Sequence, residues 1–286
     1  MANLKEIRNR ISSVSSTMQI TSAMKMVSAA KLKKAQDAIT AMRPYSDKLT
    51  ELLQSLSATL DGDSGSKFAT QREVKNVLLV VITSNRGLAG AFNSNIIKEA
   101  TNLTKEKYAE QEVSYLAIGK KANDAFKKTN KVIANKSEIF DDLTFDNVAE
   151  IAQMLMDKFV EGEFDKIEVV YNKFKNAATQ IIMNEQFLPI VPMEGEANTN
   201  VDYIFEPSKE EIVEQLIPKS LKTQLYKSIR DSFASEHGAR MTAMHKATDN
   251  ATELRDQLKL TYNKARQAAI TNEILEIVGG AEALNN

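Results

Sequence analysis

The chain has 286 residues, which is enough for one large or two ordinary domains with a substantial core. Its 37 basic and 38 acidic residues nearly cancel, so no overall field points to nucleic acid or an acidic membrane as a partner. The lack of cysteine excludes disulfides, thiolate nucleophiles and cysteine-ligated zinc. The sequence shows neither a signal peptide nor a run of about 18 uncharged apolar residues, so we expect a soluble chain that does not span a membrane.

Residues 1–61 have the pattern of one long coiled-coil helix. Mostly apolar residues recur at alternating steps of three and four in a single register, which is typical of a coiled-coil seam. A helix from Leu4 to Leu60 would extend for roughly 85 Å. The predicted seam is Leu4, Ile7, Ile11, Val14, Met18, Thr21, Lys25, Ser28, Leu32, Ala35, Ile39, Met42, Ser46, Leu49, Leu53, Leu56 and Leu60.

Residues 208–280 predict a second long helix, antiparallel to the first because both helices join the middle of the chain at their inner ends. From Ser208 to Val278 it is longer than the stretch from Leu4 to Leu60 by about 14 residues, a possible overhang of about 20 Å. An apolar overhang is costly in water, so we expect another protein to surround it. Its predicted seam is Phe233, His237, Arg240, Met244, Ala247, Ala251, Leu254, Leu258, Thr261, Ala265, Ala268, Asn272 and Leu275.

Residues 74–192 predict a small α/β domain between clusters of Gly and Pro at 60–68 and 188–208. Three strand-helix units imply parallel pairing, and a last short turn implies an antiparallel edge hairpin. The expected fold class is therefore α/β: a Rossmann-like domain with a mostly parallel sheet of about five strands, carried by a long antiparallel coiled coil. The expected strands are 77–83, 112–119, 131–135, 166–174 and 179–190, and the expected helices are 92–108, 120–128 and 144–160.

The turn between the first strand and the first helix of this domain contains Gly87 and Gly90. A strand, a Gly turn and a helix N-terminus can bind a phosphate. The spacing, however, matches neither dinucleotide nor P-loop glycine patterns. A nucleotide-binding enzyme and a purely structural turn both remain open here. No cofactor is expected, and His237 and His245 are spaced too far apart for a metal motif.

A second feature is a basic, methionine-bearing stretch of the first helix. Met24 and Met26 are expected to face outward near Lys31 and Lys33, while the seam becomes polar at Lys25. These lysines form either a solvated helix face or a surface for acidic partner loops, to which methionine side chains adapt.

Three stretches carry a resemblance that covers the whole chain in order. They are KEIRNRISSVSSTMQITSAMKMVSAAKLKKAQ near the start, SNRGLAGAFNSN in the middle, and SFASEHGARMTAMHKATDNA with LTYNKARQAAITNEILEIVGGAEAL at the end. They resemble the gamma subunit of F-type ATP synthases. The resemblance implies a non-catalytic central shaft that couples ion flow through the membrane c-ring to ATP synthesis or hydrolysis at the beta subunits.

The resemblance also implies partners and sites. The partners would be the alpha and beta subunits, epsilon and the c-ring, with no nucleic acid, at the cytoplasmic face of a bacterial inner membrane and peripheral to it. Arg266 and Gln267 match residues that hold a beta-subunit loop, and Met24, Lys25 and Met26 match the segment that faces the moving part of beta. Arg86, Gly87 and Gly90 match a structural turn, with Asn85 in place of an acid.

Two alternatives remain beside the shaft. One is an enzyme that binds a nucleotide at Gly87 to Gly90, and the other is a non-motor structural coiled coil. The second would need much longer arms with ATPase halves, and the chain has neither.

Overall fold

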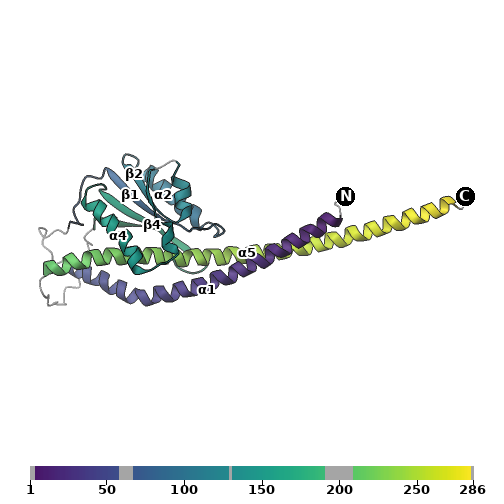
Figure 1. Cartoon of the computed structure of the whole chain (residues 1–286), viewed down its shortest axis with the longest axis horizontal. Helices are drawn as coiled ribbons and strands as arrows, with labels where there is room; N and C mark the ends of the chain where they lie inside the picture. Colours follow the sequence, from purple (N-terminus) through teal and green to yellow (C-terminus); the bar gives the residue numbers. More distant parts are fainter. Residues whose placement is uncertain (1–3, 58–66, 129–130, 191–208, 285–286) are drawn as a thin grey trace. The chain divides into compact units, whose positions relative to one another are not determined.

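The structure is a computed structural model that describes residues 4–57, 67–128, 131–190 and 209–284 (Figure 1). The chain divides into two compact units, Met1–Ser28 with Met241–Asn286, and Ala29–Arg240. Most of the two predicted boundary segments, 60–68 and 188–208, lies outside the described residues.

The secondary structure closely follows the predicted order. The elements are α1 (Leu4–Ser57), β1 (Asn76–Ile82), α2 (Phe92–Asn102), the π-helical turn η1 (Leu103–Lys107), β2 (Glu112–Ile118), α3 (Lys120–Phe126), β3 (Lys131–Asn135), the 3-10 turn η2 (Ser137–Phe140), α4 (Phe145–Val160), β4 (Lys166–Phe174), β5 (Gln180–Leu188) and α5 (Lys209–Leu284). The sequence predicted η1 as ordinary helix and did not predict η2.

The five strands form one sheet in the order β3-β2-β1-β4-β5. All neighbours are parallel except β4 and β5, which form an antiparallel hairpin at one edge. The prediction of a mostly parallel sheet with an antiparallel edge is therefore confirmed. From Val77 to Ile82, β1 is completely buried, because helices cover both faces of the sheet at its centre.

Alternate residues of β1 belong to two different cores. Val77, Leu79 and Val81 pack with residues of α2 and α3 on one face. Leu78, Val80 and Ile82 pack on the other face with α4 and with α5, whose contribution is Ile217, Leu221, Leu225 and Ile229. The first part of α5 is therefore a layer of the α/β domain, beside α4 (Figure 1).

Local signals explain where α4 begins and ends. The side chain of Thr144 accepts a hydrogen bond from the backbone N–H of Asn147 and caps the start of the helix. At the other end Gly162 has a φ of 81°. The backbone N–H of Gly162 bonds the Phe159 carbonyl, and that of Glu163 bonds the Lys158 carbonyl, which is the Schellman pattern.

Within the unit formed by residues 1–28 and 241–286, α1 and α5 pair antiparallel. Lys25 Nζ lies 3.4 Å from His245 Nδ1, and Thr21 Oγ1 lies 2.8 Å from Thr248 Oγ1. Further along, the Arg8 guanidinium donates to the Tyr262 hydroxyl at 2.8 Å. Partner numbers rise along α5 as they fall along α1, which confirms the antiparallel prediction.

The seam predicted for α1 is confirmed wherever its side chains are described. In the first unit every predicted position from Leu4 to Ser28 is buried or half-buried, and in the second unit the same holds from Leu32 to Leu49. The side chains of Leu53, Leu56 and Leu60 lie outside the described residues.

The seam predicted for α5 is wrong over part of its length. Leu254, Thr261 and Ala268 are exposed, and the half-buried residues are the next ones along the chain, Arg255, Tyr262 and Ala269. The prediction placed apolar residues on the seam, whereas α5 places polar side chains there that bond across the helix pair. Tyr262 accepts from Arg8, and Arg255 donates to the Met18 sulfur.

In the unit Ala29–Arg240, α5 also buries a polar cluster. The Arg240 guanidinium donates to Glu236 Oε1 at 2.6 Å, and both side chains are nearly buried. His237 packs edge-on against Phe233, with ring centroids 4.5 Å apart. Burial, together with the charges of Lys31 and Arg240, lowers the pKa of His237 to about 4, so this imidazole is neutral near pH 7.

Gly119 generates the first prediction. Its φ is +112°, and a Cβ built on it would lie 2.2 Å from the Thr83 carbonyl oxygen. Gly119→Ala is expected to lower the free energy of unfolding by more than about 1 kcal/mol, because neither the backbone angle nor the space accepts a side chain. Gly87→Ala is the matched control, since its Cβ would meet only Lys121 Cε at 3.9 Å. Urea melts measure both, and equal losses would contradict the prediction.

His237 generates the second prediction. Its pKa is lower in the folded chain than the usual value near 6.5, so the unfolded state binds more protons between about pH 6.5 and 4. The stability that depends on neutral His237 is therefore fully present above pH 6.5 and is lost as the pH falls towards 4. We expect the wild type to lose roughly 1 kcal/mol per pH unit more than His237→Gln in this window.

Urea melts of the wild type and of His237→Gln at pH 4.5, 5.5, 6.5 and 7.5 test this dependence. The comparison cancels the contribution of neighbouring Glu236, whose pKa is raised by burial and whose pH dependence has the opposite sign. If the free energies of unfolding of the two proteins changed in parallel with pH, the prediction would be wrong.

Candidate partner-binding surfaces

The last part of α5 is a helix without a partner among the described residues. Every residue from Ile270 to Ala281 is exposed, and α5 extends past the start of α1 in this unit (Figure 1). Five large apolar residues on it are at least 48% exposed, which is costly in water for a free helix. They are Ile270, Ile274, Leu275, Ile277 and Val278.

Arg266 and Gln267 lie just before this apolar end. Both are exposed, while Ala265 and Ala269 beside them are half-buried. Within the part of the chain that the structure describes, the Arg266 guanidinium has no hydrogen-bond or ion-pair partner. The backbone carbonyl of Gln267 accepts from the Thr271 hydroxyl at 3.0 Å, which leaves the Gln267 amide group to reach outward.

Met24, Lys25 and Met26 differ in how far they reach into solvent. Met26 is 65% exposed. Met24 and Lys25 are half-buried, and Lys25 contacts His245 of α5. The structure therefore presents Met26 outward, as expected, whereas Met24, which was also expected to face outward, is half-buried. Lys25 lies partly within the helix pair.

Lys31 and Lys33 belong to the second unit and are exposed on α1. The charge of Lys31 also acts on two buried residues of α5: it adds to the burial that lowers the pKa of His237, and it opposes the burial that raises the pKa of Glu236. Lys31 therefore has an interaction within the chain as well as a free surface.

The turn that contains Arg86, Gly87 and Gly90 is held by its own neighbours. The Ser84 hydroxyl donates to the Arg86 carbonyl at 2.6 Å, and the Ser84 backbone N–H donates to Asn93 Oδ1 at 2.9 Å. Gly90 has a φ of 58°, which suits a residue without a side chain. The Ser84 hydroxyl, the Ser84 backbone N–H and the Arg86 carbonyl are thus engaged in bonds within the turn.

The sequence did not lead us to expect that Arg240 of α5 contacts this turn. Its guanidinium donates to the carbonyls of Gly87 and Arg86 and so joins α5 to the turn. The side chain of Arg86, which was predicted as part of a structural turn, is exposed, and its backbone carbonyl accepts the bond from Arg240. The signal was present, because Arg240 falls on a seam position where a charged residue needs a partner.

Asn85 occupies the position where the resemblance led us to expect an acid. Its amide donates to the Ser137 carbonyl at 2.9 Å, and its carbonyl accepts from the Lys120 backbone N–H at 3.0 Å. A carboxylate could accept the second bond but could not donate the first. Asparagine therefore joins two loops here without a salt bridge.

The described residues contain no group of three or more side chains that could hold a metal ion. Among the same residues, no helix is both long and apolar enough to cross a bilayer. The features that face outward are those of a binding surface: an apolar helix end, two polar side chains and exposed lysines.

Comparison with known proteins assigns the family. The family model described as ATP synthase matches residues 3–284. The chain is 77% identical over 285 residues to the ATP synthase gamma chain of Flavobacterium psychrophilum, covering 99% of each. It is 76% identical to the ATP synthase gamma chain of Flavobacterium johnsoniae, covering 100% of each.

Solved structures agree on the fold. A chain of the Euglena gracilis mitochondrial ATP synthase, described as OSCP/F1/c-ring in rotational state 3, matches with a TM-score of 0.68 at 20% identity and covers 98% of this chain and 94% of that one. A chain of the rotor of the same enzyme in rotational state 1 matches with a TM-score of 0.63 at 22% identity, covering 93% and 98%. The chain belongs to the ATP synthase gamma chain family.

Proposed function

We propose that this chain is the central rotor shaft of an F-type ATP synthase, which couples ion flow through a membrane ring to ATP synthesis or hydrolysis. Family membership over the full length supports the proposal. The single structural observation that carries it is the exposed apolar end of α5, residues 270–281, which requires a surrounding protein.

A ring of alternating alpha and beta subunits is the surrounding protein that suits this end. A helix that turns inside a ring needs a narrow apolar body with few fixed contacts. The apolar residues Ile270, Ile274 and Ile277 provide that body, and Arg266 and Gln267 provide two specific polar contacts. Met26, exposed and conformationally adaptable, suits contact with a beta-subunit loop that changes shape.

The α/β domain, residues 74–192, is proposed to be the base of the rotor and to contact the c-ring and the epsilon subunit. Residues 1–61 and 208–280 are proposed to be the shaft. Neighbours described as c-ring and rotor assemblies support the first contact. This arrangement would place the chain peripherally, at the cytoplasmic face of a bacterial inner membrane.

The chain itself is proposed to perform no bond chemistry. At the turn that was the candidate nucleotide site, the Arg86 and Gly87 carbonyls accept from Ser84 and Arg240, and the glycine spacing matches neither dinucleotide nor P-loop patterns. ATP turnover then belongs to the beta subunits, and the asymmetric shaft sets the order in which their sites act.

The third prediction concerns activity. The purified chain alone should hydrolyse no ATP, and it should confer turnover with directional rotation when it is added to the alpha and beta subunits. Steady-state ATPase assays and single-molecule rotation of the reconstituted complex measure this. ATPase activity that stays with the chain after every trace of beta subunit is removed would refute the non-catalytic role.

The fourth prediction concerns Arg266 and Gln267. Inside a ring these side chains would be partly removed from water, where a charge-assisted hydrogen bond contributes about 1.5 to 3 kcal/mol. Arg266→Ala with Gln267→Ala should leave the chain folded and the complex assembled, yet slow ATP turnover several-fold. ATPase activity and ion pumping are measured on membranes with matched subunit content.

Lys246→Ala with Asn250→Ala is the matched control, because it removes one cation and one amide from exposed positions of the same helix. The control should keep wild-type rates, since surface changes without a partner usually stay within about 0.5 kcal/mol. If the Arg266 and Gln267 pair also kept wild-type rates in both assays, it would have no part in the mechanism.

A further inference from the structure

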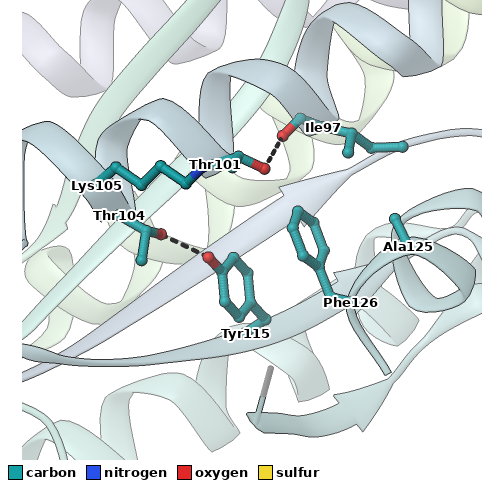
Figure 2. A pocket seen from close by; sticks show the side chains of 7 residues that line it. All are labelled: Ile97, Thr101, Thr104, Lys105, Tyr115, Ala125 and Phe126. Atoms are coloured by element: carbon teal, nitrogen blue, oxygen red, sulfur yellow. Dashed lines mark hydrogen bonds between the residues drawn. The ribbon is translucent and has the colours of Figure 1, made fainter. Parts of the chain in front are cut away.

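A cavity of about 330 Å³ lies between α2, η1 and α3, on the face of the sheet away from α4 and α5. This volume is at the small end of ligand pockets, which run from about 300 to 1,000 Å³. Figure 2 shows the seven residues that line it: Ile97, Thr101, Thr104, Lys105, Tyr115, Ala125 and Phe126. None of them belongs to the surfaces assigned to the shaft.

The cavity borders the only π-helical turn in the described part of the chain. In η1 the Tyr108 backbone N–H reaches back to the Leu103 carbonyl at 3.0 Å, which widens the helix by one residue. Buried Glu168 of β4 holds the end of this turn, accepting from Lys107 Nζ at 2.6 Å and from the Tyr108 hydroxyl at 2.5 Å. Thr104 and Lys105 are thereby fixed at the cavity by an anchor that lies outside it.

One wall of the cavity is aromatic and rigid. The rings of Tyr115 and Phe126 are stacked, with centroids 4.2 Å apart and planes 13° from parallel. Both residues are buried, and Ile97 and Ala125 extend the apolar surface beside them (Figure 2). A flat apolar ring fits such a wall better than a flexible polar chain does.

The hydroxyl protons at the cavity are already used. The Thr101 hydroxyl donates to the Ile97 carbonyl at 2.8 Å, and the Thr104 hydroxyl donates to the Ala100 carbonyl at 3.0 Å. Thr104 has a single hydroxyl proton, so the 2.5 Å contact between Thr104 and Tyr115 must use the proton of Tyr115. The hydroxyl oxygens of Thr101 and Tyr115 keep lone pairs that can accept a bond from a ligand donor.

Lys105 supplies the only charge at the cavity. It is exposed, and its ammonium has no ion-pair or hydrogen-bond partner among the residues that the structure describes. An anionic group of a ligand held against the aromatic wall could therefore pair with Lys105 without displacing an internal partner.

We propose that this cavity binds a small aromatic acid: one ring against Ile97, Ala125 and Phe126, an N–H or O–H donor bonded to the hydroxyl oxygens, and a carboxylate paired with Lys105. The site lies in the domain proposed as the base, and it uses none of the residues proposed to contact the alpha and beta subunits. Its binding can be measured on the full-length chain without other subunits.

The test uses 4-aminobenzoate, which carries a ring, a donor and a carboxylate, and follows the amide resonances of the isotope-labelled chain by NMR. We expect saturable shifts at residues of α2, η1 and α3, with a Kd on the order of 1 mM for a ligand of this size. Aniline, which lacks the carboxylate, and benzoate, which lacks the donor, should each bind several-fold more weakly.

Two substitutions separate the contributions of the lining residues. Lys105→Met should weaken 4-aminobenzoate about fivefold, as for an exposed ion pair, and leave aniline unchanged. Thr101→Val, which keeps the side-chain shape, should weaken 4-aminobenzoate but not benzoate. Lys98→Met is the matched control, an exposed lysine of α2 that does not line the cavity, and it should bind all three as the wild type does.

Absence of shifts at the lining residues in 10 mM 4-aminobenzoate would overturn the proposal. So would shifts spread over the whole chain, or a Lys105→Met variant that binds the acid as tightly as the wild type.

Discussion

The packing of α5 on the sheet is the contact on which the unit Ala29–Arg240 depends. Ile217, Leu221, Leu225 and Ile229 recur every four residues and fill the core that α4 covers only in part. Without them, one face of β1 and β4 would lie in water. One stretch of α5 must therefore pack against the sheet, and a later stretch must pack against α1. This double requirement explains why the pattern of α5 changes along its length.

Where α5 passes the end of the sheet, its apolar stripe gives way to the buried cluster of Glu236, His237 and Arg240. Removing one member of a buried charged pair costs more than the pair contributes, because the other charge is then left without a partner. Arg240 meets this constraint by bonding both Glu236 and the backbone of the turn at Gly87. The turn is thus bound to α5 through carbonyl groups, which any residue at those positions would supply.

The two outward surfaces follow from how much of each helix finds a partner within the chain. Beyond Ala269 no described residue of α1 lies opposite α5, so its apolar side chains remain exposed. At the cavity beside η1, Glu168 holds the end of the turn, Tyr115 stacks on Phe126, and among the lining residues only the charge of Lys105 has no internal partner. A helix that turns inside a ring requires a surface with few specific contacts, such as the end of α5. A small ligand requires a rigid site, such as the cavity.

The sequence by itself determined the strand order along the chain, the edge hairpin and the seam of α1, because each depends on local periodicity and short turns. It also determined the family, through stretches that cover the whole chain. Only the tertiary structure decided that α5 covers the sheet, that its seam runs through Arg255 and Tyr262, and that Arg240 holds the turn. A count of apolar residues favours Leu254 over Arg255 as a seam position. Arg255 and Tyr262 are acceptable on the seam because they bond to Met18 and Arg8, which are more than 200 residues away in sequence and become adjacent only after folding.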